Sequence, residues 1–351
     1  MTRGNDIIIS GRVTIAAPEN RIRYNNVATP TVILRRNDSF AKLLKLCEGV
    51  SPVTCAVVHP CDRGSLLGPL EAAERGLIIP VFVGPERTIR SLAEAEGVEL
   101  FPHRIVSTDH SHESAQKAVA MVRAGELDSL MKGSLHTDEL MAAVVPSATG
   151  LRTARQISHA FVLDVPVYPR LLLVTDAAIN IAPSAKEKMD IAQNAIDLAH
   201  VLKIDQPRVA ILATVETVNP EMQSTVDAAV LCKMADRGQI VGGILDGPLA
   251  FDNAVSQEAA KRKKISSPVA GKADILVLPD REAGNILAKQ LQYLAGADSA
   301  GIVLGTRAPI VLTSRADSVR TRLASIALMK LLARARRSSA PSEKGDLLHA
   351  A

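Results

Sequence analysis

Ser314 and Arg315 stand where this sequence could most readily build a site for chemistry. They follow an apolar run that ends at Leu312. Apolar residues with helical spacing come next, at Val319, Leu323, Ile326 and Leu331. The first backbone N–H groups of a helix lack partners within it, so a helix start beside an arginine can hold a phosphate dianion. Helix capping is the alternative, with Ser314 as N-cap and Asp317 three residues later in a capping box.

The segment LMKGSLHT offers a second candidate anion site. Lys132 and Gly133 end an expected strand, and Ser134 precedes an expected helix. An ammonium group and backbone N–H groups could hold an anion there. A solvated turn fits the same pattern equally well, so both interpretations stay open.

Three other polar groups have structural explanations. We expect Asp246 and Asp252 to form turns, because a Gly-Pro pair lies between them. Asp280 and Asn285 could cap the helix after the apolar run DILVLPD. His159 lies inside the apolar run HAFVLDV and is expected to be a hydrogen-bonded core residue, not a catalyst.

Several common motifs are absent. The sequence has no GxGxxG after a strand, no GxxxxGK[ST], no GxSxG and no HExxH. The four cysteines show no CxxC spacing, so we expect free thiols and no metal site. Dinucleotide-binding, P-loop, hydrolase-elbow and zinc-protease functions therefore lose their sequence support.

The composition narrows the possible partners. There is no Trp, and only three Tyr and five Phe, so base-stacking platforms for nucleic acid are not expected. A net charge of +4 with scattered basic residues gives weak support for a small anionic ligand. We find no apolar stretch of about 18 to 20 residues and no signal-peptide pattern, and we expect a cytoplasmic protein without membrane contact.

Short apolar runs alternate with amphipathic stretches along the chain. Runs such as IPVFVGP, RLLLVTD and RVAILAT suit buried strands, whereas the stretch KEKMDIAQNAIDLAHVLK has a helical stripe. This alternation predicts an α/β fold with parallel sheets, in which ligand sites lie at the carboxyl ends of strands. The length of 351 residues favours two domains.

Five segments together resemble the phosphate acetyl/butyryltransferase family. They span roughly residues 40 to 335 and comprise LMKGSLHT, TDAAINIAPSAKEK, DGPLAFDNAVS, SPVAGKADILVLPDREAGNIL and LTSRADS. The resemblance implies two α/β/α domains with a cleft between them, as in isocitrate and isopropylmalate dehydrogenases. It places domain 1 at 40–149 plus 301–337 and an inserted domain 2 at 150–300. Residues 1–39 are expected to form a linker like that of longer bifunctional members, and 338–351 a flexible tail.

The implied reaction converts acyl-CoA and phosphate into acyl phosphate and coenzyme A, in a homodimer and without a bound cofactor or metal. Within it, Arg315 would hold phosphate and Ser314 would assist at the thioester. We further expect contacts to phosphate or coenzyme A from Lys132, Gly133, Ser134, Asn285 and Thr313.

One position departs from the acetyl-directed pattern. Those members usually carry an aspartate seven residues after the serine, and here that position is Thr321. Asp317 is the nearest carboxylate and becomes the candidate general base. The wording TSRADS is closer to the butyryl branch, so a phosphate butyryltransferase is the alternative to a phosphate acetyltransferase. A decarboxylating dehydrogenase and a catalytically silent binding or regulatory module on the same fold are the competing hypotheses.

Overall fold

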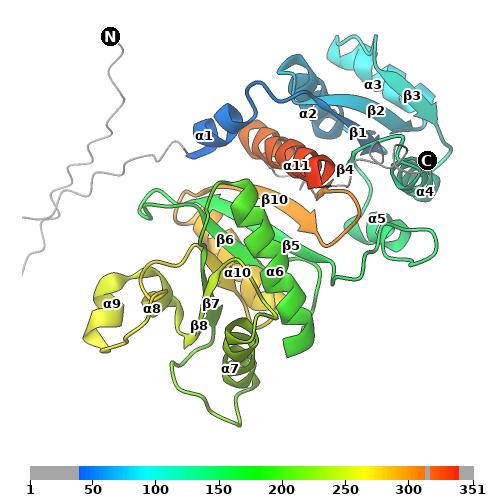
Figure 1. Cartoon of the computed structure of the whole chain (residues 1–351). Coiled ribbons are helices and arrows are strands. Elements are labelled where there is room, and N and C mark those ends of the chain that lie inside the picture. The colour runs from blue at the N-terminus through cyan, green and yellow to red at the C-terminus, as the bar shows by residue number, and fades with distance from the viewer. Residues whose placement is uncertain (1–38, 313–316, 340–351) are drawn as a thin grey trace, which may run out of the picture.

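A computed structural model describes residues 39–312 and 317–339 (Figure 1). Their strands form one sheet of eleven, in the order β3-β2-β1-β4-β11-β10-β5-β6-β9-β7-β8. Helices cover this sheet, as the buried apolar runs predicted. The α/β class is therefore confirmed.

The first half of the sheet is parallel. Its strands are β1 (Val53–Val58), β2 (Ile78–Gly84), β3 (Arg104–Ser107), β4 (Ser129–Lys132) and β11 (Ile310–Val311). The helices that connect or flank them are α1 (Ser39–Leu46), α2 (Arg63–Glu74), α3 (Glu86–Glu96), α4 (Ser111–Arg123) and α5 (Thr137–Val144). Because all these strands run in one direction, the loops after β1 and β4 meet at one edge of the sheet.

The other end of the sheet is also parallel. It contains β6 (Leu172–Thr175), β7 (Arg208–Leu212), β8 (Ile244–Leu249) and β9 (Ile275–Val277). Its helices are α6 (Ala185–Val201), α7 (Gln223–Asp236), α8 (Phe251–Val255), α9 (Gln257–Arg262) and α10 (Arg281–Tyr293).

The centre of the sheet departs from the purely parallel expectation. Strands β5 (Ser158–Asp164) and β10 (Asp298–Leu304) pair antiparallel with each other, and also with β6 and β11 respectively. Both central strands are buried on both faces, so their sequences look like those of parallel strands. The chain crosses from the first parallel group to the second between α5 and β5, and it returns between β10 and β11.

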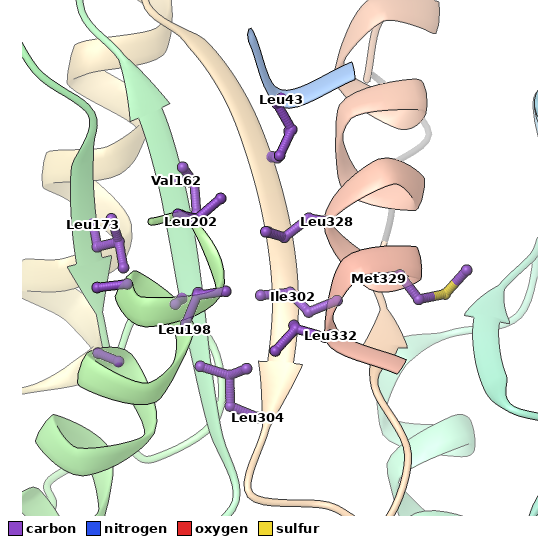
Figure 2. Close-up of a cluster of buried hydrophobic side chains, with 14 of the residues drawn as sticks. Leu43, Val162, Leu173, Leu198, Leu202, Ile302, Leu304, Leu328, Met329 and Leu332 are labelled. Carbon is purple, nitrogen blue, oxygen red and sulfur yellow. The ribbon is translucent and has the colours of Figure 1, made fainter. Parts of the chain in front are cut away.

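A large apolar core extends along the sheet beneath α1, α6 and the last helix, α11 (Val319–Ser339). Figure 2 shows how Leu43 of α1, Leu328 of α11 and Leu198 of α6 gather around Ile302 of β10. Residues from both parallel groups thus share one cluster, and this cluster holds α11 against the sheet.

Three local predictions are wrong. Helix α11 begins at Val319 and the Ser318 hydroxyl accepts a hydrogen bond from the Thr321 N–H, so Asp317 lies before the helix and not at the third helical position that the capping box requires, while Ser314 lies outside the described residues. Asp246 lies in β8 and not in a turn, since a Gly-Pro pair is tolerated in this edge strand. Asp252 lies in the short helix α8.

Candidate functional site

A pocket of about 760 Å³ opens at the carboxyl ends of β1 and β4, a volume that can hold a small substrate. Side chains from the start of α2, from the loop after β4 and from the first turn of α11 line it. They are Asp62, Arg63, Gly64, Leu67, Gly68, Glu71, Ser134, Val319 and Arg322. This pocket is the candidate site, because parallel α/β folds bind ligands at the carboxyl edge of their strands.

Helix α2 lines one side of the pocket, and α11 packs closely against it there. Asp62 is the N-cap of α2 and accepts a hydrogen bond from the Ser65 N–H at 2.8 Å. A Cβ on Gly64 would lie 2.1 Å from a guanidinium nitrogen of Arg322. The absence of a side chain at Gly64 therefore leaves the space that the Arg322 guanidinium occupies over the first turn of α2.

Hydrogen bonds connect the segment that begins at Lys132 to the end of β1. The Gly133 N–H donates to the Val58 carbonyl at 2.9 Å, and the Ser134 N–H and hydroxyl both donate to the His59 carbonyl. A Cβ on Gly133 would lie 2.2 Å from the Val58 oxygen, so glycine is needed there. Lys132 does end β4, as predicted, and its buried ammonium donates to the Gly133 and Leu135 carbonyls.

These contacts limit what the segment can offer a ligand. The Gly133 and Ser134 N–H groups already bond to the chain, so neither is directed at an anion. The Ser134 side chain nevertheless lines the pocket. The expected roles of Lys132, Gly133 and Ser134 stay predictions, with Ser134 the member that the pocket places best.

Thr313, Ser314 and Arg315 lie outside the described residues. Their neighbour Asp317 is half-buried and lies two residues before α11. Thr321, at the position where acetyl-directed members carry an aspartate, lies in the first turn of α11 and exchanges a hydrogen bond with Ser318. The 313–316 segment thus joins β11 to a helix whose first turn, through Val319 and Arg322, lines the pocket.

Asn285 does not join this group. It lies inside α10, not at its cap, and its side-chain amide donates to the Ala177 carbonyl at 3.0 Å. Asp280 is the N-cap of α10, as predicted. Asn285 belongs to the second parallel group and does not line the pocket, so its expected substrate contact stays a prediction.

His59 is a residue near the pocket that the sequence reading missed. It follows β1 with a φ of 53°, a left-handed conformation that is uncommon for a residue other than glycine. Burial lowers the pKa of its imidazole, while the nearby Glu139 carboxylate opposes that shift. Its carbonyl accepts the two Ser134 hydrogen bonds described above, so His59 holds in place a residue that lines the pocket. The only sequence signal is its place directly after an apolar run.

Thiols and metal ligands add little to the site. Cys47, Cys55, Cys61 and Cys232 are free thiols, as predicted. Among residues 39–312 and 317–339, no group of three or more His, Cys, Asp or Glu side chains is arranged to hold a metal ion. Within the same ranges, no helix is long and apolar enough to cross a membrane.

Fold and pocket together define a class of α/β proteins with a pocket at the carboxyl edge of a parallel sheet. Solved structures share this fold. A phosphotransacetylase from Streptococcus pyogenes superposes with a TM-score of 0.71 at 21% identity, covering 85% of this chain and 99% of that one. The 4-hydroxythreonine-4-phosphate dehydrogenase of Klebsiella pneumoniae gives a TM-score of 0.50 at 14% identity over 81% of this chain and 99% of that one. The dehydrogenase-like architecture is confirmed.

The chain belongs to the family described as "Phosphate acetyl/butaryl transferase", whose sequence profile matches residues 83–330. A phosphate acetyltransferase of Rhizobium meliloti is 58% identical over 300 residues, which is 86% of this chain and 95% of that protein. A phosphate butyryltransferase of Clostridium beijerinckii is 43% identical over 295 residues, covering 84% and 98%. The resemblance drawn from the five segments is thus confirmed.

Proposed function

We propose that this protein is a phosphate acetyltransferase, which interconverts acetyl-CoA plus phosphate with acetyl phosphate plus coenzyme A. The observation that carries the proposal is the 58% identity to the phosphate acetyltransferase of Rhizobium meliloti, against 43% to the butyryltransferase of Clostridium beijerinckii. The pocket at the ends of β1 and β4 supports it, because Arg63 and Arg322 line it and the helix that carries Arg322 follows Ser314 and Arg315 in the sequence.

The proposed step is a direct acyl transfer. A phosphate oxygen attacks the thioester carbonyl carbon, the C–O bond forms, and the C–S bond breaks. The phosphate gives up a proton, and the leaving thiolate of coenzyme A takes one up. Holding both substrates in one pocket makes the reaction effectively unimolecular.

In this proposal Arg315 binds phosphate through paired hydrogen bonds and Ser314 assists at the thioester. Asp317 is the proposed base, supported by its place two residues before the helix that lines the pocket. No metal or bound cofactor takes part, and coenzyme A and phosphate enter as substrates. We also propose a homodimer in the cytoplasm, for which exposed apolar residues on and after α10, Ile286, Tyr293 and Leu294, offer a contact surface.

The test is phosphate-dependent release of free thiol from acetyl-CoA by the whole chain, with butyryl-CoA in a parallel series. We expect turnover with both and higher kcat/KM for acetyl-CoA, because the two acyl groups differ by two methylenes and each is worth about 1–3 kcal/mol in an apolar pocket. Butyryl preference would reassign the protein to the alternative activity. No thiol release with either would favour the silent module.

Arg315→Ala should raise the KM for phosphate and lower kcat by at least about a hundredfold, as for loss of one transition-state contact. Arg237→Ala, at the exposed end of α7, is the matched control and should leave both constants unchanged. Normal turnover in Arg315→Ala would remove the assigned role. For the base, Asp317→Asn should lower kcat, and full activity would show that another group or none serves.

A further inference from the structure

A second pocket, of about 770 Å³, lies away from the candidate site. It is formed by α6, by the last turns of α11 and by two loops, and it shares no lining residue with the first pocket. Its wall includes the side chains of Leu198, Leu304 and Leu332. A cavity of this volume holds a small organic molecule.

The two loops are the segments in which the chain crosses between the parallel groups. Arg152 and Thr306 form an antiparallel bridge between them, and the Thr153 hydroxyl donates to the Gly305 carbonyl at 2.7 Å. The outgoing crossing contributes Arg155 to the pocket, and the returning one contributes Arg307. The pocket therefore lies at the junction of the two groups.

The pocket is positively charged. Three guanidinium groups line it, those of Arg155, Arg307 and Arg336, against the single carboxylate of Asp197, which pairs with Arg155. In the part of the chain that the structure describes, neither Arg307 nor Arg336 forms an ion pair. Two positive charges beyond the Arg155–Asp197 pair thus face one cavity.

Arg336 is held in place without a counter-ion. One of its terminal nitrogens donates to the Thr306 carbonyl at 2.7 Å, which directs α11 toward the returning crossing. Burial lowers the pKa of this guanidinium, and the Asp197 carboxylate only partly opposes the shift. A half-buried guanidinium whose position is fixed in this way is suited to pair with carboxylate or phosphate oxygens.

His200 supplies one more donor or acceptor. Its Nε2 atom lies 2.7 Å from the Gly242 carbonyl, so the ring is fixed at the edge of the pocket. The remaining ring nitrogen, Nδ1, is then available to a ligand. Charged groups from α6, α11 and both crossings therefore meet around one apolar-walled space.

We propose that this junction pocket binds a small polyanion, either a polycarboxylate or a phosphate compound, between Arg307 and Arg336. The bound anion bridges the returning crossing to α11 and so fastens the junction of the two parallel groups. This site does not depend on the transferase activity, because none of its residues belongs to the candidate catalytic pocket.

The experiment is calorimetric titration of the whole chain with citrate and, separately, with inorganic pyrophosphate, at about 0.15 M salt, where weak surface attraction is screened. The anion that binds identifies carboxylate or phosphate chemistry. We expect Arg307→Ala and Arg336→Gln each to raise its Kd about tenfold or more, the loss of roughly one charge-assisted contact. Arg237→Ala should leave the Kd within about twofold.

Amide hydrogen exchange gives the second readout. Binding should slow exchange in residues 151–157 and 304–309, and Arg307→Ala should remove this protection. Because the Arg307 side chain is exposed, that variant should fold even if Arg336→Gln does not. Three results overturn the proposal: neither anion binds, both pocket variants bind as tightly as the wild type, or binding is lost only in Arg322→Ala.

Discussion

His159 lies in an environment very different from water. The side chain is 2% exposed in β5, its ring packs edge-on against Phe161, and its Nδ1 atom has no hydrogen-bond partner among the described residues. Gly301 leaves room for it, since a Cβ there would lie 3.1 Å from Nε2. Burial lowers the pKa of His159 to about 4, and the Asp176 carboxylate opposes the shift. The ring is thus a neutral core residue at ordinary pH.

This low pKa predicts acid-sensitive stability. The unfolded chain takes up a proton near the usual value of 6.5, whereas the folded chain does so only near 4, so folding stability falls as pH drops from 6.5 to 4. The loss amounts to about 3 kcal/mol. Urea unfolding followed by circular dichroism at several pH values measures it. His159→Gln should flatten the dependence, and the exposed control His112→Gln should not; an unchanged slope in His159→Gln would contradict the assignment.

Helices α6 and α7 are joined by a buried ion pair. The Lys188 ammonium lies 2.6 Å from an Asp227 oxygen, and the two side chains are 5% and 4% exposed. Gln223 donates to the other oxygen of Asp227 at 2.7 Å. This pair fixes how the two helices pack, because an unpaired buried charge is far costlier than the intact pair.

Lys188→Met should therefore destabilise the protein by about 3–5 kcal/mol, since it leaves a buried carboxylate without its cation. The double change Lys188→Met with Asp227→Leu should regain most of that loss. An exposed ion pair on α7 gives the control. The change Lys233→Met removes the partner of Asp236 and should leave the free energy of unfolding unchanged. Urea midpoints compare the four proteins, and equal stability of Lys188→Met and wild type would show that the pair is dispensable.

The positions of the strands could be predicted from the sequence better than the direction in which they pair. Apolar runs located β2, β5 to β7 and β9, because burial on both faces leaves a clear composition signal. Strand direction is set by pairing between distant segments, so the antiparallel β5 and β10 could not be recognised. Helix α11 begins four residues later than Ser314 indicated, since packing of Leu323 and Ile326 outweighs a local capping pattern.

In the candidate site, too, features set by neighbouring residues could be predicted, whereas contacts between distant segments could not. The end of β4 at Lys132 was predicted, but its Gly133 and Ser134 groups bond to β1, which lies more than seventy positions away in the chain. Likewise Arg63 and Arg322 meet at the pocket only because α2 and α11 pack together. The family resemblance, which depends on several short segments at once, identified the function better than any one segment.

At the scale of the whole molecule, one core joins the two parallel groups. The cluster beneath α11 contains Val53 and Cys55 of β1 together with Val209 of β7 and Ile275 of β9. The sheet is also continuous from β3 to β8 in the described ranges. Since both groups contribute residues to this cluster, the predicted domains 40–149 plus 301–337 and 150–300 should unfold together.

Cysteine labelling can test this cooperativity, because the chain has no Trp to report unfolding. Cys47 directly follows α1 and Cys232 lies in α7, and burial raises their pKa values to about 11 and about 12, so both thiols react poorly while the protein is folded. Across a urea series, brief thiol labelling read by mass spectrometry should give the same midpoint for Cys47 and Cys232 as circular dichroism gives for the whole chain. A lower midpoint at Cys232 than at Cys47 would mean that the second parallel group opens by itself. The shared cluster of Val53, Val209 and Ile275 would then contribute little to joining the two groups.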